Sequence, residues 1–198
     1  MEQLVKSATA TVRGLNMFAR RGTTNLAHAP LEMGRLLETT FPMARLMVPP
    51  STEVRLDLPD REIWVRAGAA ALQQVIVNLV QNARDALNEQ PGAVITLSGE
   101  VVPNGRALNV AAAHLEGVAC GRLCVADNGP GIEPELRERV MEPFFTTKGN
   151  RGSGLGLAMA RETARRFGGA LRLVDRPGPG ATFEVLLPVT DRVDTIDP

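Results

Sequence analysis

The 198-residue sequence predicts an α+β fold in which helices cover one sheet as a two-layer sandwich. Helical periodicities and strand-like alternation are mixed along the chain, without the strict β-α-β order of a parallel sheet. Apolar residues make up 44% and charged residues 22% of the chain, which is typical of a globular domain with a real core. Only 4% are aromatic, so aliphatic side chains must fill that core.

The spacing of apolar residues predicts the individual helices and strands. Steps of three and four residues predict helices near 1–20, 31–46, 68–88 and 154–167, and a shorter one near 133–141. Strand-like runs occupy 54–58, 63–65, 94–98, part of 106–112, 123–126, 171–174 and 182–187. We expect 63–65 to pair with 54–58 as a hairpin across Pro59 and Asp60. The polar tail after Pro188 is expected to be loose.

Charge and hydropathy exclude several classes of partner. Lys plus Arg and Asp plus Glu number 22 each, without a basic stripe, which argues against a nucleic-acid partner. No apolar run reaches the roughly 18 residues that cross a bilayer, and no signal segment opens the chain. We therefore expect a cytoplasmic fragment. Cys120 and Cys124 lack C-x-x-C spacing and a nearby histidine, so buried structural thiols are expected rather than a metal site.

The helix predicted near 68–88 carries polar residues along one margin of its apolar stripe. At about 100° per residue, Asn78, Asn82 and Asp85 fall on the same flank of that stripe. Two amides and a carboxylate in this arrangement can offer oxygen ligands to a hard cation such as Mg²⁺. The alternative is an ordinary polar edge on an amphipathic helix, and the helix by itself does not decide between them.

Two glycine-rich segments suggest a nucleotide. In V-A-D-N-G-P-G-I, a strand ends at Asp127, whose carboxylate can accept a hydrogen bond from the exocyclic amine of adenine. An Asx turn is the alternative. In G-S-G-L-G-L, glycines open a helix whose free N–H groups suit phosphate. The polar loop 146–153 precedes it instead of a strand, which rejects a dinucleotide fold. This loop is expected to be a mobile lid that brings Lys148 to a phosphate.

The order of four segments carries a family resemblance. N-L-V-Q-N-A-R-D-A, D-N-G-P-G-I, E-P-F-F-T-T-K and G-S-G-L-G-L resemble the N, G1, F and G2 boxes of the histidine-kinase ATPase family. The segment 178–183 resembles its last glycine box, and the whole match spans roughly residues 31–188. The pattern is most similar to the nitrogen-regulation and dicarboxylate-sensing branch. The resemblance implies a Bergerat-type α/β sandwich that binds ATP and Mg²⁺ under a flexible lid.

The resemblance also implies roles for individual residues. Asn82 and Asn78 are expected near Mg²⁺ and, with Lys148, in catalysis, while Asp127 is expected to accept the adenine amine. The other nucleotide contacts that it implies are Gly129, Gly131, Ile132, Gly152, Ser153, Gly154, Leu155, Gly156, Leu157 and Thr182. Thr182 is expected beside Asp127, under the adenine. Gyrase-type relatives carry a water-activating glutamate where this chain has Asn78, and an amide cannot act as that base. Many members carry a lysine where this chain has Asp85.

The resemblance divides the chain into three parts. Residues 1–22 resemble the end of a dimerisation hairpin, 28–190 the catalytic ATP-binding domain, and 191–198 a flexible tail. Neither His28, beside Pro30, nor His114 has the setting of a phosphoacceptor. We therefore expect the chain to transfer the ATP γ-phosphate to a histidine on a hairpin outside it, for relay to a response regulator receiver domain. The fragment alone should be inactive in autophosphorylation, and dimerisation is expected only with the full hairpin.

Two other functions stay open on the sequence. One is a serine kinase of anti-sigma type on the same fold, against which the F-F-T-T-K box and the leading helix count. The other is a nucleotide-binding adaptor without kinase activity, against which the intact asparagine and glycine boxes count.

Overall fold

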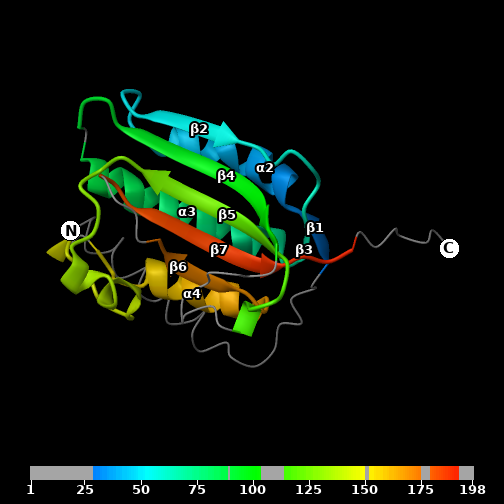
Figure 1. The fold of residues 1–198 in the computed structure, drawn as a ribbon. Helices are drawn as coiled ribbons and strands as arrows, with labels where there is room; N and C mark the ends of the chain where they lie inside the picture. Colours follow the sequence, from blue (N-terminus) through cyan, green and yellow to red (C-terminus); the bar gives the residue numbers. More distant parts are fainter. Residues whose placement is uncertain (1–28, 89, 104–113, 150–151, 175–178, 192–198) are drawn as a thin grey trace.

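The computed structural model describes residues 29–88, 90–103, 114–149, 152–174 and 179–191. Within these ranges the architecture is the predicted two-layer α+β sandwich (Figure 1). The helix expected near 1–20, the strand expected within 106–112 and the tail from 192 onward lie outside the described residues, as does His28.

One layer is a five-stranded sheet with the strand order β2-β4-β5-β7-β6. Only β2 and β4 are parallel, and the other neighbours are antiparallel. The strands are β2 (Glu53–Asp57), β4 (Val94–Val102), β5 (Cys120–Asp127), β7 (Thr182–Pro188) and β6 (Ala170–Leu173). Strands β4 and β5 are both longer than their apolar cores predicted, because cross-strand hydrogen bonds extend the ladder from Ile95–Asp127 to Val102–Cys120.

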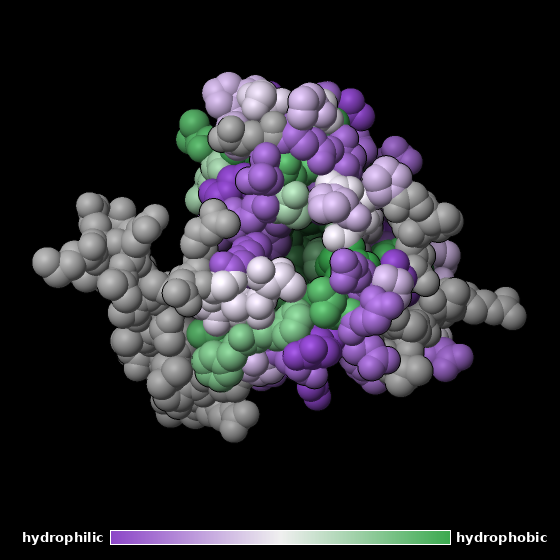
Figure 2. Space-filling view, turned by 90° about the vertical axis from the view of Figure 1, so that its left-hand side faces the viewer, coloured by the Kyte–Doolittle hydropathy of each residue, from purple (hydrophilic) through white to green (hydrophobic). Residues whose placement is uncertain are grey.

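The other layer consists of three helices on one face of this sheet: α2 (Met33–Leu46), α3 (Ala69–Leu87) and α4 (Gly156–Arg166). The end of α3, the end of β5 and the beginnings of β7 and α4 lie at the left of Figure 1. That end of the molecule faces the viewer in Figure 2. The segment expected to form one helix near 133–141 forms two short 3-10 helices instead, Pro134–Leu136 and Arg139–Met141.

The predicted hairpin between 54–58 and 63–65 is wrong. Strand β3 (Trp64–Arg66) pairs antiparallel with β1 (Pro30–Glu32) in a separate two-stranded sheet, and β2 pairs in parallel with β4. The predicted start of the second helix at 31 is wrong for the same reason, since Leu31 pairs with Val65. Helix α2 begins at Met33, where the Glu32 carboxylate accepts hydrogen bonds from the N–H groups of Gly34 and Arg35.

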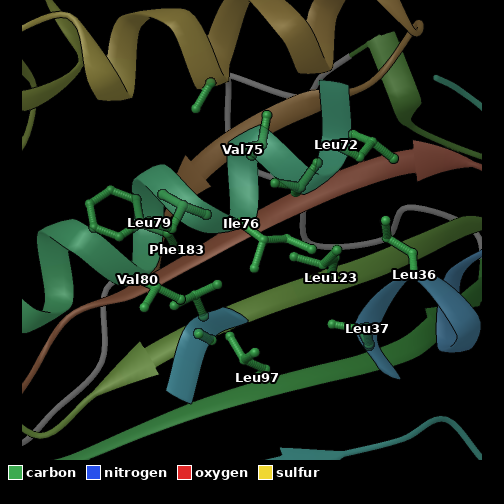
Figure 3. Close-up of a cluster of buried hydrophobic side chains, with 14 of the residues drawn as sticks. Leu36, Leu37, Leu72, Val75, Ile76, Leu79, Val80, Leu97, Leu123 and Phe183 are labelled. Atoms are coloured by element: carbon green, nitrogen blue, oxygen red, sulfur yellow. The ribbon is translucent and has the colours of Figure 1, made fainter. Parts of the chain in front are cut away.

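The core lies between α3 and the sheet (Figure 3). The predicted stripe of α3 is confirmed, and all of its members are buried: Leu72, Val75, Ile76, Leu79, Val80, Ala83 and Leu87. Opposite them lie Leu97, Leu123 and Phe183 from three neighbouring strands. The helix ends at Asn88, which adopts a left-handed conformation with φ 40°. Burial of this stripe fixes how α3 is rotated about its axis.

We expect Ile76→Ala to lower the free energy of unfolding by about 2–5 kcal/mol, because it removes fully buried carbons and leaves a cavity against the sheet. Urea unfolding followed by circular dichroism measures this change. Leu46→Ala is the control, since Leu46 is 88% exposed; its expected change is within about 0.5 kcal/mol. Equal losses in the two variants would contradict the packing described for α3.

Candidate functional site

Helix α3 brings three separate loops together along one side. At its C-terminal end, a Cβ on Gly129 would lie 3.6 Å from Leu87 Cδ2 and 3.7 Å from the Ala86 carbonyl carbon. One turn earlier, the Lys148 ammonium donates a hydrogen bond to Asn82 Oδ1 at 3.2 Å. One turn before that, Asn78 Nδ2 donates to the Gly156 carbonyl at 3.5 Å. Segments that are far apart in sequence therefore meet along about 12 Å of one helix.

The space-filling view of this end shows a hollow near its centre (Figure 2). Hydrophobic residues lie in the depth of the hollow, and hydrophilic residues occupy much of the surrounding surface. A site of this kind can bury an apolar ring system while polar groups at its edge fix the orientation.

Asp127 ends β5 on the face of the sheet that carries the helices. Its Oδ1 accepts hydrogen bonds from the N–H groups of Gly129, at 2.9 Å, and Ala181, at 3.2 Å. Among the residues that the structure describes, none donates a hydrogen bond to Oδ2. Burial raises the pKa of the Asp127 carboxyl above its ordinary value, although the two backbone hydrogen bonds act in the opposite direction. Asp127 is therefore a partly desolvated acceptor with one oxygen available to a ligand.

The backbone around Asp127 is close-packed in a way that only glycine permits. Gly180 has φ 97°, and a Cβ there would overlap the Asp127 carbonyl oxygen. Gly131 has φ 81°, and a Cβ there would lie 3.0 Å from the Gly180 carbonyl oxygen. Both glycines therefore meet a conformational and a steric requirement. The predicted pocket residue Ile132 follows, partly buried against the main core.

Asn128 holds this turn to the start of β4, a role that the sequence analysis missed. Its side-chain oxygen accepts from the Val94 N–H and its amide nitrogen donates to the Gly92 carbonyl, both at 2.8 Å. Its own carbonyl accepts from Gln90 Nε2 at 3.0 Å. The D-N-G sequence predicted a local turn, whereas these hydrogen bonds join residues that are 34 to 38 positions apart in the sequence.

Thr182 does not lie beside the Asp127 carboxylate. It is the cross-strand partner of Ala126, and successive residues of a strand point to opposite faces of the sheet. The Thr182 side chain, which is 4% exposed, is therefore on the face opposite to the Asp127 side chain. The neighbouring residue Ala181 contacts Asp127 instead, through its backbone N–H.

The two predicted metal ligands differ in their availability. Asn78 Oδ1 already accepts a hydrogen bond from Gln74 Nε2 at 2.9 Å, and its amide nitrogen points to the Gly156 carbonyl. Asn82 Oδ1 accepts from an ammonium group, so this oxygen is directed at a position that a cation occupies. In the described ranges, no group of three His, Cys, Asp or Glu residues is arranged to hold a metal. Mg²⁺ can be bound by one amide oxygen of the protein together with phosphate oxygens of a substrate. The oxygen of Asn82 is better suited to this role than the oxygen of Asn78.

Lys148 forms an ion pair that the sequence analysis did not anticipate. Its ammonium lies 2.8 Å from Asp85 Oδ2, and the two side chains are 32% and 34% exposed. Arg84 Nη2 lies 2.7 Å from the other oxygen of Asp85. Burial acts to raise the pKa of Asp85, but Lys148 and Arg84 together outweigh it and hold the pKa below its ordinary value. The sequence signal for this ion pair was the position of Asp85, which lies one turn from Asn82 on the same flank of the helix.

The remaining glycine-box residues form the loop into α4. Gly154 has φ 65° and lies against the backbone of Phe144, whose N–H donates to the Gly154 carbonyl at 2.9 Å. Gly152 lies against the Thr146 side chain, and Ser153 Oγ accepts from the Leu155 N–H at 3.4 Å. Leu155 precedes the helix and is buried, Gly156 is its first residue, and Leu157 packs partly against the main core. The first residue of α4 and Lys148 thus both contact the polar margin of α3, at Asn78 and Asn82.

Comparisons with known proteins agree with this geometry. The family described as "Histidine kinase-, DNA gyrase B-, and HSP90-like ATPase" matches residues 67–191. The two-component sensor PprA of Pseudomonas aeruginosa is 43% identical over 143 residues, which are 69% of this chain and 14% of that protein. The C4-dicarboxylate transport sensor protein DctB of Rhizobium meliloti is 32% identical over 186 residues, which are 93% of this chain and 27% of DctB.

A solved structure extends the comparison to the fold. Full-length ShkA in complex with AMPPNP matches with a TM-score of 0.66 and 26% identity, covering 93% of this chain and 36% of that one. The chain spans less than a third of each of the two curated relatives described above. The similarity to DctB agrees with the predicted dicarboxylate-sensing branch.

The chain belongs to the histidine kinase-, DNA gyrase B- and HSP90-like ATPase family. Within that family it is an ATP-binding catalytic domain of the sensor histidine kinase type. Strand β2 and helix α2, which precede the matched range, belong to the same sheet and core. Among the described residues, no helix is long and apolar enough to span a membrane. Cys120 and Cys124 are both buried, as expected.

We expect the stability of the wild type relative to an Asp127→Asn variant to fall as pH rises from about 4, the ordinary range of an unfolded aspartate. Because the folded-state pKa is raised, the native state binds more protons than the unfolded state between the two pKa values. Stability is therefore lost through that interval and stays constant above the folded-state pKa. Urea unfolding of both proteins across the pH range measures the difference. A difference that is constant or grows with pH would contradict the burial described for Asp127.

Proposed function

We propose that this chain binds Mg²⁺·ATP at the hollow end and transfers the γ-phosphate to a histidine on a dimerisation hairpin. The observation that carries the proposal is the Asp127 carboxylate. One of its oxygens is held by two backbone N–H groups, and the other is left available at a partly buried strand end. A carboxylate held in this way selects a base with an exocyclic amine, which donates a hydrogen bond to it. A base with a carbonyl at that position has no proton to donate and would be repelled.

The chain's own residues would then divide the work along α3. Asp127 accepts the adenine amine, with Gly129, Gly131 and Ile132 around the base. Asn82 Oδ1 holds Mg²⁺. Asn78 is a weaker candidate for this ligand, because its side-chain oxygen already accepts a hydrogen bond from Gln74. The ion, when bound, neutralises charge on the phosphates. The N–H groups at the start of α4, from Gly156 and Leu157, face the phosphates, and Lys148 supplies a mobile cation.

Transfer to a protein acceptor is favoured over hydrolysis. A water molecule needs a general base for attack, and the amide of Asn78 cannot accept the proton. Its oxygen is also engaged by Gln74. The pocket therefore positions and neutralises the triphosphate without activating water, and phosphoryl transfer depends mainly on such positioning. A response regulator receiver domain is the proposed final acceptor of the relay.

We propose that the acceptor histidine is neither of the two histidines of this chain. Of the two histidines, His114 is exposed and lies before β5, and His28 falls outside the described range. We propose that residues 1–22 are the end of the hairpin and that residues 28–190 form the catalytic domain. Assembly as a homodimer is proposed to require the complete hairpin.

We expect Asp127→Asn to weaken ATP binding roughly 10- to 100-fold, because a charge-assisted hydrogen bond contributes about 1.5–3 kcal/mol. The asparagine keeps an oxygen for Gly129 and Ala181 but presents an N–H group to the adenine amine. Isothermal titration calorimetry measures the affinity, and circular dichroism checks the fold. Asp57→Asn, at an exposed carboxylate, is the control with the same charge change. Unchanged ATP affinity in a folded Asp127→Asn variant would remove the adenine assignment.

We expect the chain to label a separately supplied hairpin with acid-labile phosphate when incubated with γ-labelled ATP. The rate should be low, because an untethered acceptor has a lower effective concentration. The same hairpin with its histidine replaced should stay unlabelled, and the Asp127→Asn variant should label the wild-type hairpin more slowly at subsaturating ATP. Strong labelling of the chain in the absence of a hairpin would contradict the proposal and direct attention to His28 and His114.

A further inference from the structure

An ion pair joins α3 to Lys148, the last residue of the F-F-T-T-K box, and the Asp85 carboxylate in this pair also binds Arg84. Asp85 Oδ2 binds the Lys148 ammonium at 2.8 Å, and Asp85 Oδ1 binds Arg84 Nη2 at 2.7 Å and Nε at 3.0 Å. Each oxygen of Asp85 thus has its own cation. Lys148 can leave Asp85 without leaving this carboxylate unpaired.

Arg84 is also held by a contact with helix α2. Its Nη1 donates to the carbonyl of Met47, the residue that caps the C-terminus of α2. The guanidinium therefore connects the C-terminal end of α2 to Asp85. This contact orients the carboxylate independently of Lys148, so Asp85 presents Oδ2 to the loop whether or not the loop is engaged.

Lys148 also occupies the oxygen that the metal needs. Its ammonium lies 3.2 Å from Asn82 Oδ1, the atom proposed above as the Mg²⁺ ligand. Two cations in contact with one oxygen would repel each other strongly at that separation. Metal binding at Asn82 therefore requires Lys148 to move, and the lysine that moves is the one proposed to reach a phosphate.

We propose that Asp85 is a positioning residue that keeps Lys148 on Asn82 until the metal–nucleotide complex arrives, and that it makes the site selective for that complex over free ATP. This inference rests on the proposed function. When Asn82 exchanges the ammonium for the metal, Lys148 is released to the phosphates and Asp85 keeps Arg84. Free ATP brings no replacement cation for Asn82, so Lys148 can reach its phosphates only by giving up Asp85 and Asn82 without a substitute.

The test is an Asp85→Asn variant of the 198-residue chain, which removes the charge and keeps the side-chain shape. Asp60→Asn, at an exposed carboxylate remote in sequence from the site, is the matched control. Asp85→Glu restores the charge and should restore the wild-type behaviour. Two quantities are measured: the Kd of ATP with Mg²⁺ and with a chelator, and the rate of trypsin cleavage after Lys148 without nucleotide or metal.

In Asp85→Asn we expect the ratio of the Kd with chelator to the Kd with Mg²⁺ to fall roughly three- to tenfold, because Lys148 is then free to reach the phosphates of free ATP. Cleavage after Lys148 should accelerate about two- to fivefold, as expected for the loss of a partly exposed ion pair. Asp60→Asn should match the wild type in both. If the wild type binds Mg²⁺·ATP and Asp85→Asn matches it in both measurements, the inference about Asp85 is overturned and the proposed function stands. If the wild type does not bind ATP under either condition, both are overturned.

Discussion

The structure depends on one constraint: α3 must bury its apolar stripe against the sheet and, at the same rotation, present its polar margin to solvent. The stripe from Leu72 to Leu87 is buried, so the helix cannot turn about its axis without exposing aliphatic carbons. The margin residues Asn78, Asn82 and Asp85 are consequently held at fixed angles. The segments that carry Gly129, Lys148 and Gly156 meet this margin or the end of the same helix.

The proposed base end of the site depends on close backbone approach rather than on side chains. Gly180 and Gly131 adopt left-handed conformations, and Gly180 lies against the Asp127 carbonyl. This approach lets the Ala181 N–H reach the Asp127 carboxylate from the neighbouring strand. A side chain at Gly180 would push β7 away from β5, and the carboxylate would lose one of its two donors. Asn128 supports the same turn from the other side by holding it to β4.

The proposed phosphate end depends on charge balance. Asp85 binds both Lys148 and Arg84, and the Lys148 ammonium also donates a hydrogen bond to Asn82. These side chains are about one third exposed, so solvent weakens each interaction and the arrangement can rearrange at modest cost. Such weak contacts would favour the proposed exchange of Lys148 for a metal ion at Asn82. A fully buried ion pair would hold the lysine too firmly.

The sequence by itself determined the elements and the chemistry-bearing segments. The stripe of α3, the strands around Leu123 and Phe183, and the Asp127 and G-S-G-L-G-L segments follow from local periodicity and local composition, which act over a few residues. Tertiary structure decided which segments pair. Strand β3 joins β1 rather than β2, and β2 lies parallel to β4, because strand pairing depends on contacts between distant segments. It also decided that Thr182 faces away from Asp127 and that Lys148 binds Asp85. Side-chain face and ionic partners are set by register and by the meeting of loops, which no local pattern encodes.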